Sequence, residues 1–306
     1  MQRDEELSLL LSVSIRGKLF CVPSAANWAV SYPDQMPLPR RRMPITLTSL
    51  TLYPIKSARG IRVSEWEVDD FGLRHDRRFM VVDRSGEFLT QRDYPSLGLV
   101  APGVDRDTLR VAAPGMPPLE LPLSPMCSVV TRVTVWNDTC DATWMGEKAA
   151  EWFSRFLGCD CSLVHMDAET RRPTDPRFDT TGSRVSFADA FPFLLISEES
   201  LIDLNGRLVA PIPMNRFRPN LVVAGTDPYA EDSWRRIEIG KIPLDVVKPC
   251  SRCVITTTDQ TTTERSDEPL RTLATYRKVD GKVMFGQNAV HYGSGSLRVG
   301  DLVIVH

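Results

Sequence analysis

The sequence predicts a β-rich protein of mixed α and β structure, built from two β-rich units with few helices. Between residues 44 and 166, short stretches of alternating apolar and polar residues are separated by turn residues, which is typical of strands. From about residue 220 the chain is again strand-like to its end. Two segments, at residues 146–158 and from Ser197, have the apolar period of a helix.

In the first unit the strands are expected to pair as hairpins. Residues 79–91, "FMVVDRSGEFLTQ", predict a hairpin with Ser85 and Gly86 in its turn. Residues 107–123 predict a strand, a Gly/Pro turn and a second strand. Residues 128–136, "SVVTRVTVW", alternate as a further strand should.

A helix is predicted at residues 146–158, where the apolar period changes. Ala149, Trp152, Phe153 and Phe156 have the spacing i, i+3, i+4, i+7, which places them on one face. Gly158 is a suitable residue to end the helix. The stripe is expected to pack into a core, and "LVH" after it predicts a strand.

The second unit is predicted to start with a long polar loop, residues 167–183, which contains prolines. A strand "FLLIS" follows, and a helix is expected to begin at Ser197, with acidic residues in its first turn. The remaining segments predict strands: "NLVVAG", "RIEIGKIPLDVV", "VITTT", "VMFGQNAV" and "SLRVGDLVIV".

Composition excludes several classes of protein. A net charge of -2 over 306 residues gives no general attraction to nucleic acid or to an anionic membrane. No apolar run approaches the ~20 residues of a membrane helix. Seven cysteines, an odd number spread over a long chain, do not suggest a disulfide framework. We therefore expect a cytoplasmic protein with reduced thiols.

Residues 1–43 differ from the rest because they lack sustained periodicity and end in "PLPRRRM". We expect them to be a disordered or mis-annotated extension, with the natural start at Met43.

Two cysteines, Cys250 and Cys253, are separated by two residues in "KPCSRCVITTTD", residues 248–259. Zinc needs four ligands, but the sequence has no second C-x-x-C. A redox pair needs a helix N-terminus, whereas strands are expected on both sides. Two thiols buried in a β core are a third possibility, although Lys248 and Arg252 are poor neighbours for a core. A cation beside a thiol favours the thiolate, which binds metal. The spacing alone leaves all three open.

Several segments resemble one protein family. "VVKPCSRCVITTTD", "EPLRTLATYR", "FGQN" and "RVGDLVIV" resemble the C-terminal half of a MOSC domain, and "LYPIKSARG", "GLRHDRRFMVVD" and "AAEWFSRFLG" resemble the β-barrel domain that precedes it. The order is kept from about residue 45 to 305. The resemblance implies an N-terminal β-barrel-like domain over 44–166 and a MOSC β-barrel domain with a few helices over 167–306.

The resemblance also implies a molybdenum cofactor, Mo-molybdopterin, in which one protein thiolate completes the metal sphere. By motif position this ligand, and the residue at the catalytic centre, is Cys253, while Cys250 has no assigned role. Because the pterin carries a phosphate, its contacts should be basic or rich in donors. The implied cofactor-binding residues are Lys56, Ser57, Arg78, Arg218, Asn220, Arg252 and Asn288.

Relatives of this kind include bacterial MOSC proteins that reduce N-hydroxylated compounds and the mitochondrial amidoxime-reducing component. The resemblance therefore implies an oxidoreductase acting on hydroxylamines, amidoximes or N-hydroxylated base analogues. The sequence has no iron–sulfur cysteine spacing, so electrons are expected from a separate ferredoxin- or flavin-type reductase. The alternatives are a non-catalytic carrier of the cofactor, a sulfur-handling MOSC protein, and a zinc-bound structural module.

Overall fold

The computed structural model describes residues 44–125 and 129–306. The expected N-terminal extension, residues 1–43, lies outside the described residues. Within the described part, no helix is both long and apolar enough to cross a membrane.

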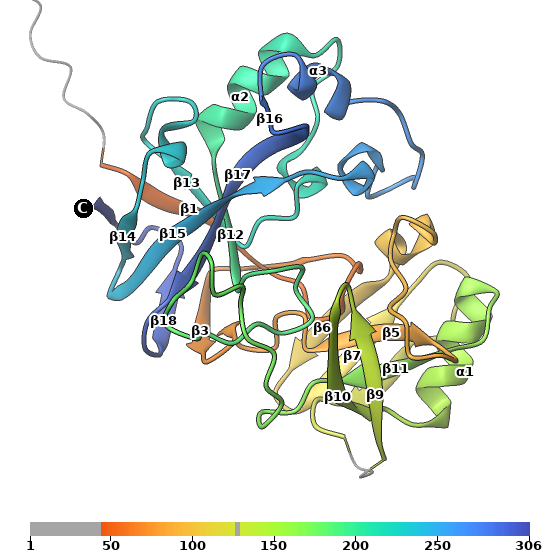
Figure 1. Cartoon of the computed structure of the whole chain (residues 1–306). Helices are drawn as coiled ribbons and strands as arrows, with labels where there is room; N and C mark the ends of the chain where they lie inside the picture. The colour runs from red at the N-terminus through yellow and green to blue at the C-terminus, as the bar shows by residue number, and fades with distance from the viewer. Residues whose placement is uncertain (1–43, 126–128) are drawn as a thin grey trace, which may run out of the picture. The chain divides into compact units, whose positions relative to one another are not determined.

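The largest sheet of the described chain has nine strands (Figure 1). Its main path runs in the order β19-β14-β15-β17-β12-β13-β1-β2, and β16 pairs with β17 beside it. These strands are β1 (Thr46–Leu52), β2 (Ile61–Val63), β12 (Phe193–Ser197), β13 (Leu221–Ala224), β14 (Arg236–Ile239), β15 (Ile242–Ser251), β16 (Lys278–Val279), β17 (Lys282–His291) and β19 (Val303–Val305).

This sheet joins segments that are distant in sequence. The first strand, β1, pairs antiparallel with β13, so that Leu50 lies opposite Leu221 (Figure 1). The central strand β12 pairs parallel with β13 and antiparallel with β17. The sheet thus takes strands from both sides of the domain boundary expected near residue 166, and that boundary stays a prediction.

The other strands form three smaller sheets. They are β5 (Phe79–Asp83), β11 (Cys161–His165), β10 (Asp138–Trp144) and β9 (Val130–Val135) in one sheet, β6 (Ala101–Asp105), β7 (Thr108–Ala112) and β8 (Leu119–Pro122) in the second, and β18 (Gly295–Arg298), β3 (Glu65–Asp69) and β4 (Gly72–Leu73) in the third. The hairpins predicted at 79–91 and 107–123 are confirmed. With three α-helices in the described residues, the predicted β-rich, mixed class is confirmed.

Both predicted helices are confirmed. Helix α1 (Glu147–Leu157) ends at Gly158, whose φ of 70° is the left-handed value that glycine adopts without strain. Its residues Ala149, Trp152 and Phe153 are buried. Helix α2 (Glu198–Arg207) is capped by Ser197, whose hydroxyl accepts from the backbone N–H of Ser200. A third, short helix is α3 (Leu270–Ala274).

One predicted strand is wrong. The segment "VITTT" after Cys253 forms the 3-10 helix η4 (Val254–Thr257) rather than a strand. Its threonines turn the backbone, because the hydroxyl of Thr256 donates to the Cys253 carbonyl and that of Thr257 donates to the Val254 carbonyl. The other 3-10 helices are η1 (Pro95–Leu99), η2 (Met214–Arg216) and η3 (Ala230–Asp232).

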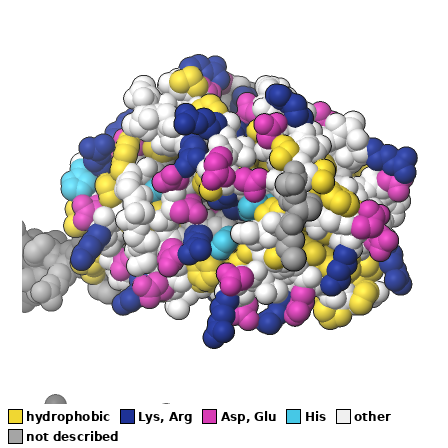
Figure 2. All heavy atoms as spheres, turned by 90° about the horizontal axis from the view of Figure 1, so that it is seen from below, with side chains coloured by type: hydrophobic (Ala, Val, Ile, Leu, Met, Phe, Trp, Pro, Cys, Tyr) yellow, Lys and Arg dark blue, Asp and Glu magenta, His cyan; other side chains and the backbone are white. Residues whose placement is uncertain are grey.

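The surface of the described chain carries charges of both signs. On the face in Figure 2, basic and acidic side chains are interspersed. This mixture agrees with the small net charge of the sequence. Concentrated positive charge is instead found in a pocket.

Candidate functional site

The candidate site is a pocket whose walls come from segments far apart in sequence. They are the turn after β1, the residues just before β5, the stretch 90–92, the segment before β12, the segment between η2 and β13, the end of β15 with η4, and one residue of β17. The polar and charged lining residues are Lys56, Ser57, Arg77, Thr90, Arg92, Asp189, Arg218, Asn220, Cys250, Ser251, Arg252, Cys253, Thr256 and Asn288. The structure therefore brings together seven of the eight predicted site residues.

Three lining residues have an uncommon backbone conformation. Ser57, Arg77 and Arg218 have φ values of 67°, 48° and 57°, in the left-handed region that residues other than glycine rarely adopt. Each such residue costs on the order of 1–3 kcal/mol and persists only where the surrounding structure enforces it. Such positions cluster at ligand sites, and here they direct polar side chains into one pocket.

The lining is strongly cationic. The described residues that line the pocket include one carboxylate, Asp189, and five cations: Lys56, Arg77, Arg92, Arg218 and Arg252. The ammonium of Lys56 lies 2.6 Å from that carboxylate and 2.8 Å from the Phe187 carbonyl. Four guanidinium groups around one acid leave a net positive pocket, which favours an anionic ligand.

Burial disfavours the charged form of two of these cations, Lys56 and Arg218. Burial lowers the pKa of Lys56, although Asp189 opposes that shift. Burial, assisted by the charge of Arg77, also lowers the pKa of Arg218 to about 10. The Arg218 guanidinium lies 4.4 Å from the centre of the Tyr53 ring and has no carboxylate within ion-pair distance among the described residues. A bound anion would relieve both shifts.

Asn220 is fixed by hydrogen bonds on both sides of its amide. Its Oδ1 accepts from Arg77 at 2.8 Å and from the backbone N–H of Leu194 at 3.3 Å. Its Nδ2 donates to the Thr51 carbonyl at 3.1 Å. Arg77 also forms an ion pair with the buried Asp76. The network sets the orientation of Arg77 at the pocket wall.

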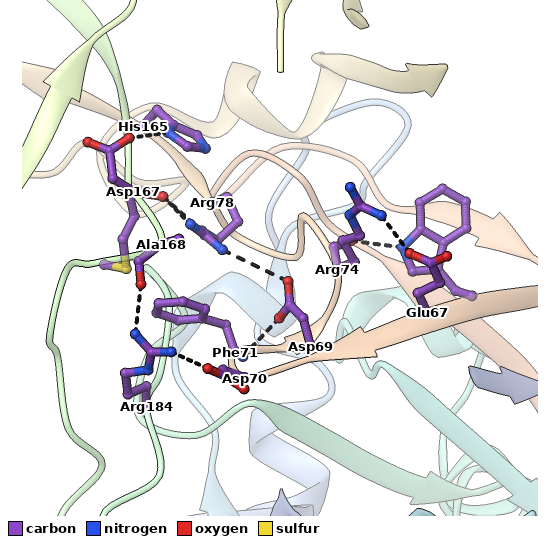
Figure 3. A network of polar contacts seen from close by, with 12 residues as sticks. Glu67, Asp69, Asp70, Phe71, Arg74, Arg78, His165, Asp167, Ala168 and Arg184 are labelled. Atoms are coloured by element: carbon purple, nitrogen blue, oxygen red, sulfur yellow. Dashed lines mark hydrogen bonds and ion pairs between the residues drawn. The ribbon is translucent and has the colours of Figure 1, made fainter. Parts of the chain in front are cut away.

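The assignment of Arg78 to the pocket is corrected by the structure. Its guanidinium points away and donates through Nε to the Met166 carbonyl at 2.9 Å. It lies 4.0 Å from Asp69 and stacks on Phe71 at 4.2 Å, in the network of Figure 3. The preceding residue, Arg77, lines the pocket instead. The physical reason is the positive φ of Arg77, which turns the two neighbouring side chains in different directions.

The two cysteines contact different arginines. Arg92 donates to the Cys253 sulfur at 3.4 Å, and Arg252 donates to the Cys250 sulfur at 2.9 Å. Arg252 also donates to the Phe217 carbonyl at 2.5 Å, while its buried Nε has no partner among the described residues. Asn288 donates to the Lys248 carbonyl at 3.2 Å. Each sulfur therefore lies beside a cationic side chain in the pocket lining.

A polyhistidine or polycarboxylate metal site is a poor match to the described residues. Among them, no group of three or more His, Cys, Asp and Glu side chains is placed to hold a metal ion.

Sequence reasoning missed Arg77, Arg92 and Asp189. Arg92 reaches Cys253 because hydrogen bonds join residues 91–92 to the loop after η4. Gln91 and Gln260 exchange amide hydrogen bonds at 3.0 and 2.9 Å, and Arg265 donates to the Arg92 carbonyl at 2.7 Å. No spacing in the sequence signals a contact across about 160 residues, so only the tertiary fold shows it.

Comparison with known proteins identifies the family of the chain. The family model of the MOSC N-terminal beta barrel domain matches residues 44–160, and that of the MOSC domain matches residues 182–304. The chain is 38% identical to mitochondrial amidoxime-reducing component 1 of Mus musculus over 87% of this chain and 84% of the relative. It is 37% identical to the Homo sapiens protein of the same name over 96% and 92%.

A longer relative shares the same region. The molybdenum cofactor sulfurase of Oryza sativa subsp. japonica is 33% identical over 79% of this chain but only 32% of its own length. Two matched domain models, in the predicted order, and relatives that align over most of both chains confirm the resemblance. The chain therefore belongs to the MOSC-domain family and carries the N-terminal MOSC β-barrel domain.

Proposed function

We propose that the protein is a molybdenum-cofactor-dependent reductase of N-hydroxylated compounds, such as hydroxylamines, amidoximes and N-hydroxylated base analogues. The observation that carries the proposal is the Cys253 sulfur in the lining of a pocket whose described residues also include five cations and one acid. Relatives named amidoxime-reducing component support the reaction class.

The pocket fits an anionic pterin on physical grounds. Lys56, Arg77 and Arg218 offer charge and planar donors to a phosphate. The buried Nε of Arg252 has no partner within the described part of the chain and can donate to a ligand. Ser57 and Asn220 add donors from two further segments. Cys253 would hold the metal, since soft thiolate suits it.

When bound, the molybdenum cofactor supplies the two electrons for reduction of the N–OH bond. The overall balance is one N–OH group, two electrons and two protons, giving one N–H group and one water. The chain's residues supply the setting. The arginines hold the anionic group, and Arg92 holds the Cys253 sulfur from one side. Asp189, fixed by Lys56, offers an acceptor for a substrate N–H.

Electrons come from a separate donor protein of the ferredoxin or flavin type. The proposal also places the protein in the cytoplasm. Fractionation of the native cells tests this location. These two points rest on the sequence.

A second candidate is a non-catalytic cofactor carrier or sulfur-handling protein. It is favoured by the likeness to molybdenum cofactor sulfurases over most of this chain. The two candidates share the pocket and differ in turnover. A carrier binds the cofactor tightly and reduces no N-hydroxylated compound with any donor.

The test compares the wild type with Cys253→Ser and the matched control Cys250→Ser. Molybdenum and pterin content are measured, together with reduction of benzamidoxime by a chemical reductant. We expect Cys253→Ser to lose molybdenum and turnover, and Cys250→Ser to keep molybdenum. Full molybdenum occupancy and activity in Cys253→Ser would refute the ligand assignment. Bound cofactor without turnover in the wild type would favour the carrier, and zinc without molybdenum would favour a structural module.

A further inference from the structure

A second pocket adjoins the candidate cofactor pocket. The two share Asp189 and Ala190 in their linings. The walls of the second pocket are the turn between β9 and β10, at Trp136–Asp138, and the loop 172–177. A molecule in this second pocket lies directly beside the group bound in the first.

Trp136 is an unusual residue for its position. It occupies a two-residue turn between paired strands with a φ of 59°, a place usually given to glycine or asparagine. Its side chain is 41% exposed, so burial does not explain the bulky ring. Non-glycine residues in this conformation are uncommon, and they are enriched at ligand sites.

The indole is nevertheless held in place on several sides. Its Nε1 donates to Asp189 Oδ1 at 3.2 Å. The guanidinium of Arg92 lies 4.3 Å from the ring centre, and the Phe88 ring lies 5.2 Å away. Arg92 also contacts the Cys253 sulfur. A single guanidinium therefore separates the indole from the proposed metal ligand.

The lining of the second pocket includes a buried arginine held by several hydrogen bonds and a carboxylate acceptor. The buried Arg172 donates to the carbonyls of Ser186 and Ala188, both at 2.6 Å, and pairs with Asp138 at 2.8 Å. Asp189 uses Oδ1 for Lys56 and Trp136, and its Oδ2 has no partner among the described residues. An aromatic wall beside a free carboxylate oxygen suits a flat group that carries N–H donors.

We propose that the second pocket is the substrate subsite, and that Trp136 makes it selective for N-hydroxylated groups attached to a flat aromatic ring. The ring of the substrate packs against the indole, and an N–H of its amidoxime donates to Asp189. This inference rests on the proposed reductase function and adds the residue that sets its selectivity.

Aryl selectivity is the quantity that tests the proposal. Benzamidoxime and acetamidoxime carry the same reducible group, and only the first has a ring. In Trp136→Leu, with molybdenum content matched to the wild type, we expect KM for benzamidoxime to rise about three- to tenfold, the range for an aromatic pair. KM for acetamidoxime should change less than twofold, and kcat should stay within about twofold for both.

Two further variants guard against indirect effects. Trp136→Phe keeps a ring and should keep most of the selectivity. Trp66→Leu removes an indole that bonds the Arg74 carbonyl outside both pockets, and it should leave the selectivity unchanged. Because displacement of Arg92 affects both substrates equally, the ratio of the two KM values isolates direct contact. An unchanged ratio in Trp136→Leu overturns the proposal.

A binding measurement distinguishes failure of the subsite proposal from failure of the proposed reductase function. Benzamidine and acetamidine bind without being reduced and can be titrated calorimetrically into the holoprotein. If the wild type reduces neither amidoxime but Trp136→Leu weakens benzamidine alone by three- to tenfold, the subsite stands and the reductase function fails. If benzamidine does not bind the wild type, or binds Trp136→Leu equally well, the subsite proposal fails.

Discussion

Replacing Arg78 and Arg218 separately by methionine distinguishes a structural arginine from a ligand-binding one. Arg78 is buried, donates twice to the Met166 carbonyl and stacks on Phe71. Arg218 has a ring contact with Tyr53 and faces the pocket. Methionine keeps most of the apolar stem in both cases. We therefore expect Arg78→Met to lose stability and Arg218→Met to lose cofactor binding.

The magnitudes follow from the contacts. A hydrogen bond from a charged group contributes about 1.5–3 kcal/mol, and a partly buried cation–π contact about 1 kcal/mol. Removing the cost of burying the charge offsets part of this loss. We expect Arg78→Met to lower the free energy of unfolding by about 3 kcal/mol, or Tm by roughly 6–12 °C. For Arg218→Met, relief of an unpaired charge balances the lost ring contact, so stability should stay within about 1 kcal/mol of the wild type.

Urea unfolding of the cofactor-free protein measures the stabilities, with an unchanged slope as evidence that the same surface is exposed. Molybdenum content of the folded protein, loaded in cells that make the cofactor, measures binding. Arg78→Met should retain molybdenum when folded, and Arg218→Met should lose most of it. Wild-type stability together with loss of molybdenum in Arg78→Met would refute this reasoning and restore the assignment made from sequence.

Two further predictions concern stability. Burial and the nearby Arg78 lower the pKa of His165 to about 4. Since the unfolded chain, with a histidine pKa near 6.5, binds the proton more readily, stability should fall by about 3 kcal/mol as pH drops from 6.5 to 4. His165→Gln should remove that part of the slope in unfolding measured at several pH values, and an unchanged slope would contradict it. Gly286→Ala should cost about 3 kcal/mol, because φ is 78° and the added Cβ would lie 2.6 Å from Ile196. Gly115→Ala, at a φ of 73° in open space, should cost only about 1 kcal/mol, and equal costs would show that β12 does not pack as closely on β17 as described.

Local features of the sequence predicted local structure well. The apolar spacing of α1 and the glycine after it are sufficient to define that helix, because both act within one or two turns. The same holds for Ser197 at the start of α2. The segment after Cys253 was predicted wrongly because β-branched residues favour strands, while side-chain bonds from its threonines stabilise a 3-10 turn.

The residues of the pocket lining could be predicted where a family motif specifies one residue. They could not be predicted where the fold decides which of two neighbouring side chains faces the pocket. Arg77 and Arg78 are adjacent and chemically identical, so sequence chemistry cannot distinguish them. The backbone conformation at Arg77 decides which side chain enters the pocket. The sequence likewise places Trp136 at the end of a predicted strand, and the contacts with Asp189 and Arg92 that motivate its proposed role are visible only in the tertiary structure.

The sequence by itself determined the β-rich class, the two confirmed helices, the family and the cysteine pair, because these depend on local periods and short motifs. The tertiary structure decided which charges meet. Lys56, Arg92, Arg218 and Cys253 come from four distant segments and share one pocket only after strands such as β1 and β13 have paired. Electrostatic interactions depend on distance in space, and in a β-rich fold that distance is set by strand pairing between residues far apart in the chain.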